Sequence, residues 1–312
     1  MELVVGRGLL FRMNDLVERR AVFIGARADY DPSYLVVVGA PMDFTASWRP
    51  GSRTGPVRIR EVSESLEEYS PRLERDLGTI KFCDIGDVII PYGDVEGSLA
   101  AIKGTVKKIF ADGKRPIVLG GEHLITLPVI SALKETWEDN GAWPYDKRGR
   151  AFPVIIHFDA HADLRDDYMG QKLSHATVMR RVSEVVGGHN IYQFGVRSGT
   201  REEYEFASRH TNLRGGDFLE SLSRALREIE DAPVYVTLDI DIIDPAFAPA
   251  TGNPEPGGVT SRELLEAIWL LKGLDIVGFD LVEVAPVYDR GDITSILAAK
   301  IVREALLIMG TS

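Results

Sequence analysis

The chain has 312 residues, of which 45% are hydrophobic and 27% are charged, and its formal net charge is −11. This balance is that of an average globular protein and excludes an intrinsically disordered chain. The acidic charge argues against a nucleic-acid-binding protein, which needs a basic surface. A single cysteine, Cys83, excludes an intramolecular disulfide and a zinc site built from several cysteines.

Targeting and membrane signals are absent from the sequence. The N-terminal residues lack the basic segment and apolar run of a signal peptide. No apolar stretch approaches the ~20 residues that are needed to span a bilayer. We therefore expect a soluble, cytoplasmic protein that works without a membrane or a nucleic-acid partner.

Short apolar runs alternate with amphipathic helical patterns along the chain. The expected strands are 34–38, 80–83, 116–119, 153–157, 191–194, 234–238 and 276–279. Apolar spacing predicts helices at 99–110, 219–229 and 293–301, and Thr260 to Glu263 is a capping box that would open another. This alternation predicts an α/β fold with a parallel sheet covered by helices on both faces. No linker divides the chain, so residues 1–312 are expected to form one domain.

The first polar cluster follows the expected strand 153–157, at the strand end where open α/β sheets bind ligands. It contains Asp159, His161 and Asp163, which would share one face if the chain stayed extended. A polar loop with a capping aspartate could contain the same residues. However, such a run beside a buried strand is costly unless something binds it, which favours a metal site. His157 lies within the strand and is expected to be a core residue without a catalytic role.

Two further candidate groups follow other expected strands. Asp239 and Asp241 would repel each other on one face unless a dication lies between them. His123 follows two glycines, which permit a sharp turn near a helix start. Together with the first cluster, two histidines and four carboxylates exceed the needs of one metal ion and suit a pair that shares carboxylates. Oxygen-rich ligands with imidazole and no thiolate favour two Mn²⁺ ions over Zn²⁺.

Several motifs, in order between about residues 35 and 305, resemble those of the ureohydrolase family, which contains arginases, agmatinases and their relatives. The matching segments are 49–56, 120–123, 159–163, 238–258 and 282–286. Two positions depart from the family pattern. Glu122 stands where the Gly-Gly-Asp-His motif has aspartate, and Asn253 stands where threonine is usual, close to the expected position of the substrate.

The resemblance implies a three-layer α/β/α sandwich around an eight-stranded, mainly parallel sheet, assembled into homo-oligomers such as trimers or hexamers. It implies that the metal ligands are His123, Asp159, His161, Asp163, Asp239 and Asp241. Asp159 and Asp239 would bridge the two ions. Glu283 would hold the guanidinium of the substrate, and His175 would transfer a proton to the leaving amine. We expect Asp163 to orient the attacking hydroxide as well.

The segment from Tyr168 to Ala176 lacks the Ser-Gly-Asn-x-His-Gly run with which arginases hold the amino-acid end of arginine, and it looks like the agmatinase version. We therefore expect a small guanidino substrate, agmatine, to be hydrolysed to putrescine and urea. Arginase, guanidinobutyrase and formiminoglutamase activities are alternatives that a substrate panel would separate. Outside this class, a catalytically silent structural subunit could keep the fold for assembly, and a metal count would reveal it.

Overall fold

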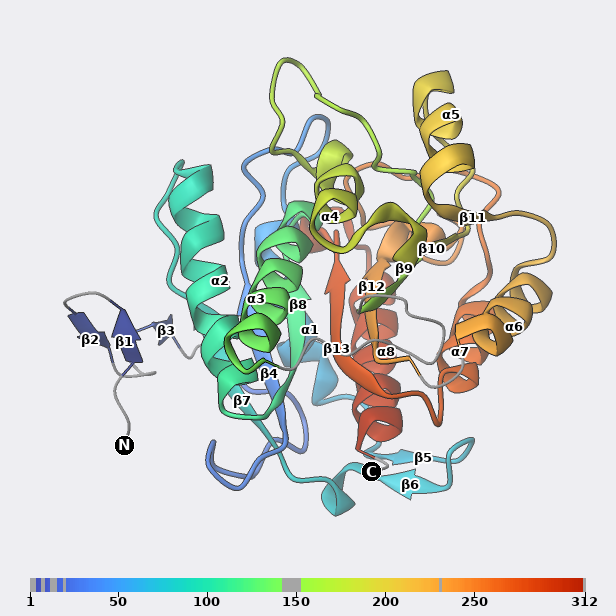
Figure 1. Ribbon diagram of the computed structural model, residues 1–312. Coiled ribbons are helices and arrows are strands. Elements are labelled where there is room, and N and C mark those ends of the chain that lie inside the picture. The colour runs from blue at the N-terminus through green and yellow to red at the C-terminus, as the bar shows by residue number, and fades with distance from the viewer. Residues whose placement is uncertain are drawn as a thin grey trace.

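A mostly parallel sheet runs through the middle of the protein, with helices on both faces (Figure 1). The structure is a computed structural model that describes residues 16–18, 21–141, 153–229 and 232–310, with the backbone of residues 4–6 and 9–11. Within this part of the chain, the fold class predicted from the sequence is confirmed.

The strands of the central sheet are mostly continuous apolar runs, because both of its faces are covered by helices. In chain order they are β3 (Val17–Glu18), β4 (Leu35–Ala40), β7 (Phe82–Val88), β8 (Arg115–Gly120), β9 (Val154–Phe158), β10 (Ile191–Phe194), β11 (Asn212–Arg214), β12 (Val234–Asp239) and β13 (Ile276–Val282). All seven strands expected from the sequence are present; the strand at 191–194 has the expected ends, and each of the others is shifted at one end or both. Strands β3 and β11 were not predicted from the sequence, since neither contains an apolar run long enough to be recognised.

The strand order among the described residues is β11-β10-β9-β12-β13-β8-β4-β7-β3. Within the described part of this sheet, eight strands are parallel, and β3 pairs antiparallel with β7. Two small antiparallel pairs lie outside this sheet, β1 (Val4–Gly6) with β2 (Leu9–Phe11) and β5 (Tyr69–Ser70) with β6 (Arg75–Asp76). The predicted eight-stranded parallel core is therefore extended by one short edge strand.

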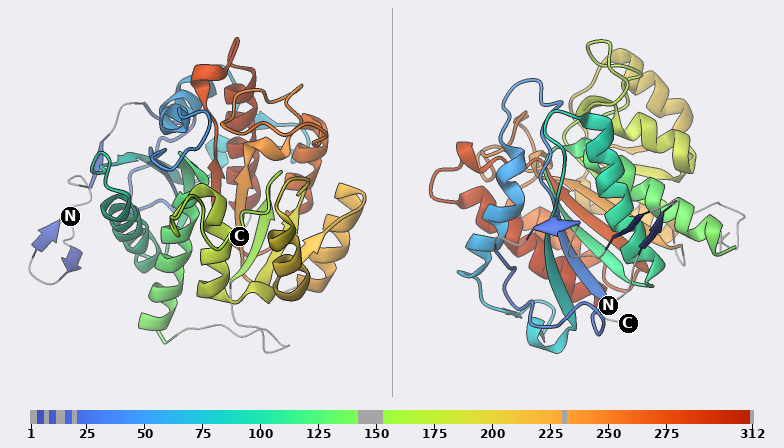
Figure 2. Two further views of the ribbon diagram at one scale, coloured as in Figure 1. Left: turned by 90° about the horizontal axis from the view of Figure 1, so that it is seen from above. Right: turned by 90° about the vertical axis from the view of Figure 1, so that its left-hand side faces the viewer.

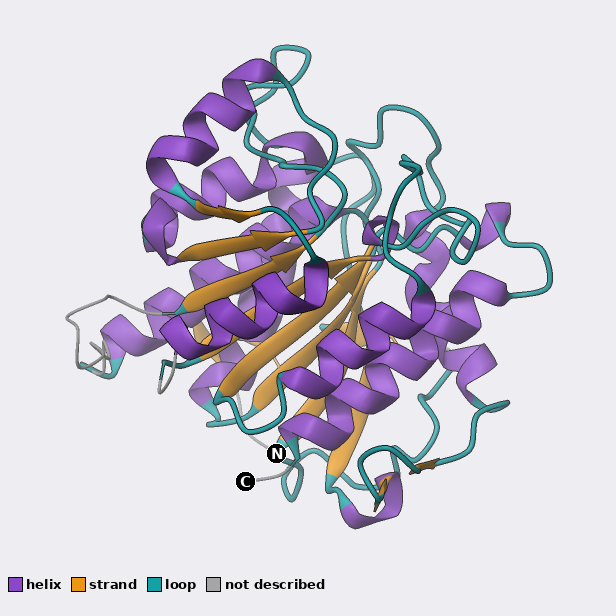
Figure 3. Cartoon of the chain, turned by 90° about the vertical axis from the view of Figure 1, so that its right-hand side faces the viewer, coloured by secondary structure: helices purple, strands orange, loops and turns teal. Residues whose placement is uncertain are grey.

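Helices form a separate hydrophobic core on each face of the sheet (Figures 2 and 3). One layer contains α1 (Gly55–Ser63), α6 (Phe218–Ile229), α7 (Ser261–Leu270) and α8 (Ile293–Met309). The other contains α2 (Val95–Ala111), α3 (Thr126–Asp139), α4 (Val178–Val186) and α5 (Arg201–His210). The predicted capping box opens α7, where the Thr260 hydroxyl accepts a hydrogen bond from the Glu263 backbone N at 3.2 Å. None of the described helices is long and apolar enough to cross a membrane.

The connections that follow the central strands leave the sheet in opposite directions. Helices α3 and α4, which follow β8 and β9, cover one face, whereas α7 and α8, which follow β12 and β13, cover the other. Because β9 neighbours β12 and β13 neighbours β8, adjacent connections diverge at both of these positions. Such switch points are where open α/β sheets bind ligands, beyond the carboxyl ends of the strands.

A buried ion-pair network ties α1 to the sheet. Arg60 is 1% exposed, and its Nε donates to Asp84 Oδ2 at 2.7 Å, while its guanidinium also contacts Asp87. Removing one partner of a buried pair typically costs about 3–5 kcal/mol, because the other charge is left without compensation. We therefore expect Arg60→Met to lower the free energy of unfolding by about that amount in urea titrations.

The matched control is Arg262→Met, which removes an exposed arginine that pairs with Glu266. Exposed pairs contribute little, so this variant should stay within about 0.5 kcal/mol of the parent. Equal losses in the two arginine variants would contradict the role given to the buried network.

Candidate metal centre

Neighbouring strands bring the polar residues of the site to one edge of the sheet. The pairing of Phe158 with Leu238 puts Asp159 and Asp239 next in register at the ends of β9 and β12. Glu283 directly follows β13, the next strand in the sheet. Residues far apart in sequence therefore meet because their strands end at the same level.

His123 reaches this edge through a close approach of two backbone segments. The backbone N of Gly121 donates to Ala40 O at 3.1 Å, and the backbone N of Glu122 donates to Met42 O at 2.7 Å. A Cβ atom at Gly121 would lie 1.9 Å from the carbonyl oxygen of Met42, so a side chain cannot be accommodated. The sequence predicted a sharp turn from these glycines, and at Gly121 the physical requirement is this close contact.

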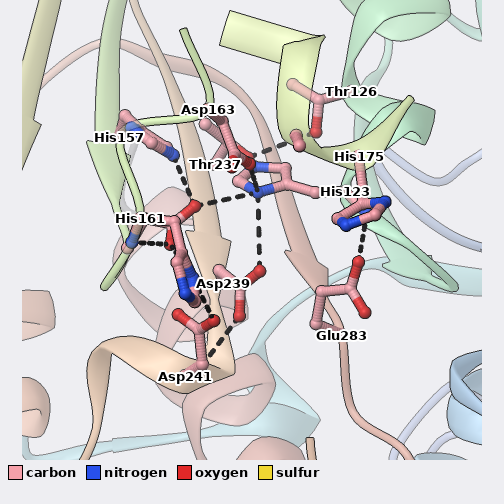
Figure 4. Close-up of polar contacts among 12 residues, drawn as sticks. His123, Thr126, His157, His161, Asp163, His175, Thr237, Asp239, Asp241 and Glu283 are labelled. Atoms are coloured by element: carbon pink, nitrogen blue, oxygen red, sulfur yellow. Dashed lines mark hydrogen bonds and ion pairs between the residues drawn. The ribbon is translucent and has the colours of Figure 1, made fainter. Parts of the chain in front are cut away.

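Three carboxylates surround the imidazole of His123 (Figure 4). Its Nδ1 lies 3.0 Å from Asp159 Oδ2 and 3.2 Å from Asp163 Oδ2. The Oδ2 atom of Asp239 is 3.5 Å away. All four side chains are buried, and Nδ1 of His123 has no hydrogen-bond partner in the part of the chain that the structure describes.

The other nitrogen of His123 has a defined partner. The hydroxyl of Thr237 donates to Asp280 Oδ1 at 2.6 Å, so its oxygen accepts from His123 Nε2 at 2.9 Å. The neutral ring then has its lone pair on Nδ1, directed at the carboxylates, where a cation would relieve the repulsion. This unpartnered buried nitrogen fits a bound metal ion.

A second group lies on the other side of Asp159. The Nδ1 atom of His161 is 2.8 Å from Asp241 Oδ2 and 3.6 Å from Asp159 Oδ1. The Oδ1 atom of Asp241 accepts from the backbone N of Ala160 at 3.0 Å, and this bond fixes the carboxylate. The six predicted ligands thus lie around two histidines, with Asp163 and Asp239 beside His123 and Asp241 beside His161, and each oxygen of Asp159 faces a different histidine. This arrangement suits a carboxylate that is shared by two cations.

Two acidic residues of the site adopt the left-handed backbone conformation that side chains normally avoid. The φ angle is 53° at Asp163 and 64° at Glu283. The chain is therefore not extended at Asp163, so the condition under which Asp159, His161 and Asp163 would share one face does not hold at this position. Such conformations cost about 1–3 kcal/mol each and are concentrated at functional sites.

The metal-free site holds more buried negative charge than it can stabilise. Burial raises the pKa of Asp239 well above its usual range, and burial together with Asp159 raises the pKa of Asp163 to about 7. Burial alone would lower the pKa of His123, but the three surrounding carboxylates outweigh it and hold that pKa well above its usual value. Without a cation the centre therefore retains protons.

A cavity of about 390 Å³ opens over the two groups. Glu283 lies on its wall, and its Oε1 accepts from the backbone N of His123 at 2.8 Å. Burial raises the pKa of Glu283 to about 8, with a further contribution from the charge of Glu122. The half-buried Asn253 also lines this cavity, as expected from its position in the family signature.

His175 lies on the same wall, just after the N-cap residue Ser174 of a short 3₁₀ helix. Its backbone N donates to Thr45 Oγ1 at 3.0 Å, and its Nε2 is 3.4 Å from the hydroxyl of Ser47. Burial lowers the pKa of His175 to about 4. Thr45 also donates its backbone N to Glu122 Oε2 at 2.7 Å, so it connects two of the residues singled out in the sequence.

Comparison with known proteins gives the family of this chain. Residues 33–308 match the model of the arginase family. The chain belongs to the arginase family.

Individual members of this family can be aligned with this chain over nearly its full length. An agmatinase of Bacillus anthracis is 48% identical over 289 residues, which cover 92% of this chain and 95% of the relative. A guanidinobutyrase of Pseudomonas aeruginosa is 35% identical, with 93% and 91% covered. The crystal structure of the agmatine ureohydrolase of Thermoplasma volcanium has a TM-score of 0.78 at 33% identity, covering 94% of this chain and 95% of that one. The family resemblance drawn from the sequence motifs is confirmed.

One contact of this arginase-family site was not predicted from the sequence. His157 is buried, as expected of a core residue, but its Nε2 lies 2.8 Å from Asp159 Oδ2. The available signal was its position two residues before Asp159, which places both side chains on one face of an extended strand.

The raised pKa values predict how the metal-free protein responds to pH. Glu122 has its pKa raised from 4.5 to about 7, chiefly by burial, and that of Glu283 is raised to about 8. Each group binds its proton more tightly when folded, so its contribution to stability is present at low pH and is lost as the pH rises through these values. In EDTA, the free energy of unfolding should therefore fall between about pH 5 and pH 8.

The variant Glu122→Gln cannot ionise at this position. Over the same pH range in EDTA, its free energy of unfolding should fall by about 3 kcal/mol less than that of the parent protein. An unchanged slope in this variant would show that burial of Glu122 does not cause the pH dependence.

Proposed function

We propose that this chain hydrolyses agmatine to putrescine and urea at a centre of two Mn²⁺ ions. The observation that carries the proposal is the pair of ligand groups joined at Asp159, beneath a cavity that is also lined by the half-buried Glu283. The Bacillus anthracis agmatinase, at 48% identity over nearly the whole chain, supports the choice of substrate.

The proposed ligands of the ions are His123, Asp159, His161, Asp163, Asp239 and Asp241. Two imidazoles with four carboxylates and no thiolate suit Mn²⁺ better than Zn²⁺. When bound, such a pair lowers the pKa of water from ~15.7 toward ~7 and so supplies hydroxide near neutral pH. Asp163 lines the cavity, where its carboxylate would accept a hydrogen bond from the nucleophile and orient it.

Glu283 would hold the guanidinium group of the substrate. A guanidinium stays cationic, with a pKa of ~13.8. The Oε1 atom of Glu283 is already fixed by the His123 backbone, so Oε2 is the oxygen available to the substrate. A cation at this position would favour the ionised carboxylate, whose pKa is about 8 in the metal-free protein.

His175 would deliver the proton that the leaving amine needs. With a pKa of about 4 it is neutral at pH 7, so it would carry a proton only transiently. The nearby hydroxyls of Ser47 and Thr45 give its two ring nitrogens hydrogen-bonding neighbours, both at 3.4 Å. The ring can therefore receive a proton on one side and donate it on the other.

The far end of agmatine is a primary ammonium, which needs an acceptor near the cavity mouth. Glu255 lines the cavity and is half-buried, and its carboxylate has no ion pair or hydrogen bond among residues 21–141, 153–229 and 232–310. Tyr168 and Ala176, from the segment that differs from arginases, also line the cavity. We assign the ammonium to Glu255 on this basis.

Guanidinobutyrate is the second candidate substrate, and Arg165 favours it. This arginine lies on the cavity wall, where it could receive a carboxylate tail, and its Nε is 3.5 Å from Glu203 Oε2. Since Glu203 compensates much of its charge, we rank agmatine first. A cytoplasmic trimer or hexamer built from one domain per chain completes the proposal, on the strength of the family.

The substrate proposal is tested by urea release from agmatine, guanidinobutyrate and arginine with the Mn²⁺-loaded protein. We expect urea from agmatine, because the cavity pairs two carboxylates with the two cationic ends of that molecule. Release from guanidinobutyrate alone would instead assign the tail to Arg165. Release from none of the three would overturn the proposed function.

The role of His175 is tested by His175→Ala. Loss of a general acid typically lowers turnover by about 10²–10⁴-fold, so kcat for agmatine should fall within that range. The metal content should match that of the parent, because His175 belongs to neither ligand group. Wild-type turnover, or loss of bound metal, would contradict the assigned role.

The role of Glu255 is tested by Glu255→Gln with two substrates. For agmatine, KM should rise about tenfold, as expected for loss of a charge-assisted hydrogen bond. For butylguanidine, which has no ammonium tail, KM should be unchanged. Equal shifts with both substrates would indicate general damage to the cavity and refute the assignment.

A further inference from the structure

A row of polar residues crosses the sheet one layer below the candidate ligands. His157 on β9 pairs with Gln193 on β10 and with Thr237 on β12, and Thr237 pairs with Asp280 on β13. All four are completely buried. Polar groups inside a sheet are costly unless they are hydrogen-bonded, so the partners of each member decide what the row does.

The amide of Gln193 has one orientation. Its Nε2 donates to the carbonyl oxygen of Ala162 at 2.9 Å, and its Oε1 accepts from Thr211 Oγ1 at 3.0 Å. A carbonyl oxygen can only accept, so the nitrogen must occupy this position. The same Nε2 is 3.1 Å from His157 Nδ1 and donates its second hydrogen there. Nδ1 of His157 is therefore an acceptor, and the ring hydrogen is on Nε2.

This hydrogen points at the carboxylate shared by the two groups. Nε2 of His157 donates to Asp159 Oδ2 at 2.8 Å, the same oxygen that lies 3.0 Å from His123 Nδ1. The other oxygen, Oδ1, accepts from the backbone N of His161 at 2.6 Å. Both oxygens of Asp159 are thus held, one on the side of each ligand group.

We propose that His157 is a positioning residue of the metal centre, and that its Nε2–H orients Asp159 so that each carboxylate oxygen faces one cation. Gln193 acts through His157, because it holds the ring in the required tautomer. This inference rests on the proposed metal site and deepens it. In this role His157 is not a metal ligand, although one of its nitrogens lies in a cluster with His123, Asp159 and Asp163. A nitrogen that carries the hydrogen has no lone pair for a metal.

Hydrogen bonds to ligating groups typically contribute about 10–100-fold to metal affinity. We therefore expect His157→Met, which removes the donor at similar volume, to weaken Mn²⁺ binding by about 10–100-fold in calorimetric titrations of the metal-free protein. His157→Gln places an amide N–H near the position of Nε2 and should restore most of this affinity. His189→Met, at an exposed histidine, is the matched control and should bind like the parent.

Gln193→Met is a second test that leaves His157 in place, and it should weaken Mn²⁺ binding by about tenfold. It keeps the proposal testable if the His157→Met protein does not fold, which thermal unfolding in EDTA would show. Unchanged affinity in His157→Met, or equal losses in His157→Met and His157→Gln, would overturn the positioning role while leaving the proposed function intact. Failure of the parent protein to bind two ions would overturn both.

Discussion

Buried negative charge at the carboxyl ends of β9 and β12 is the constraint on which the rest of the site depends. Asp159, Asp239 and Asp241 are at most 3% exposed, and carboxylates cannot be ionised together at such depth without compensating positive charge. In the metal-free protein, protonated His123 and His161 supply part of it. When these rings are neutral, their ring nitrogens have lone pairs that can bind cations, and the cations then supply the charge. The close approach at Gly121 and the left-handed conformations at Asp163 and Glu283 follow from the need to bring these groups together.

His123 and His157 lie in one cluster but have different roles, since one would bind a cation and the other donates a hydrogen bond to Asp159. Their hydrogen-bond partners on the neighbouring strands determine these roles. Thr237, already committed to Asp280, accepts from His123 Nε2 and leaves Nδ1 free for a cation. Gln193 donates to His157 Nδ1 and turns Nε2 into a donor toward Asp159. A list of nearby nitrogens and oxygens would treat both rings as ligands. The hydrogen-bond partners distinguish them.

The sequence predicts this architecture well where one physical signal dominates. Seven strands were recognisable because parallel strands covered on both faces are apolar runs, and the acidic residues at their ends stand out for the same reason. No range was predicted for α1, α3, α4 or α5, although a helix start was expected near His123. In α1 and α3, Pro56 and Pro128 interrupt the usual pattern, although proline is tolerated in a first helical turn.

The contacts within the site that the sequence does not predict depend on how the strands pair and how the backbone runs between them. The contacts of Gln193 with His157 and of Thr45 with Glu122 join residues that are 36 and 77 positions apart. Only the register of the sheet and the backbone path bring them together. The local pattern of residues 159–163 also does not reveal the left-handed turn at Asp163.

The central claim is that two cations share Asp159. Anomalous scattering from crystals of the protein grown with Mn²⁺ tests this most directly. The account predicts two peaks about 3.5–4 Å apart, one beside His123 and one beside His161, with the Asp159 carboxylate between them. A single peak, or two peaks that do not flank Asp159, would contradict it.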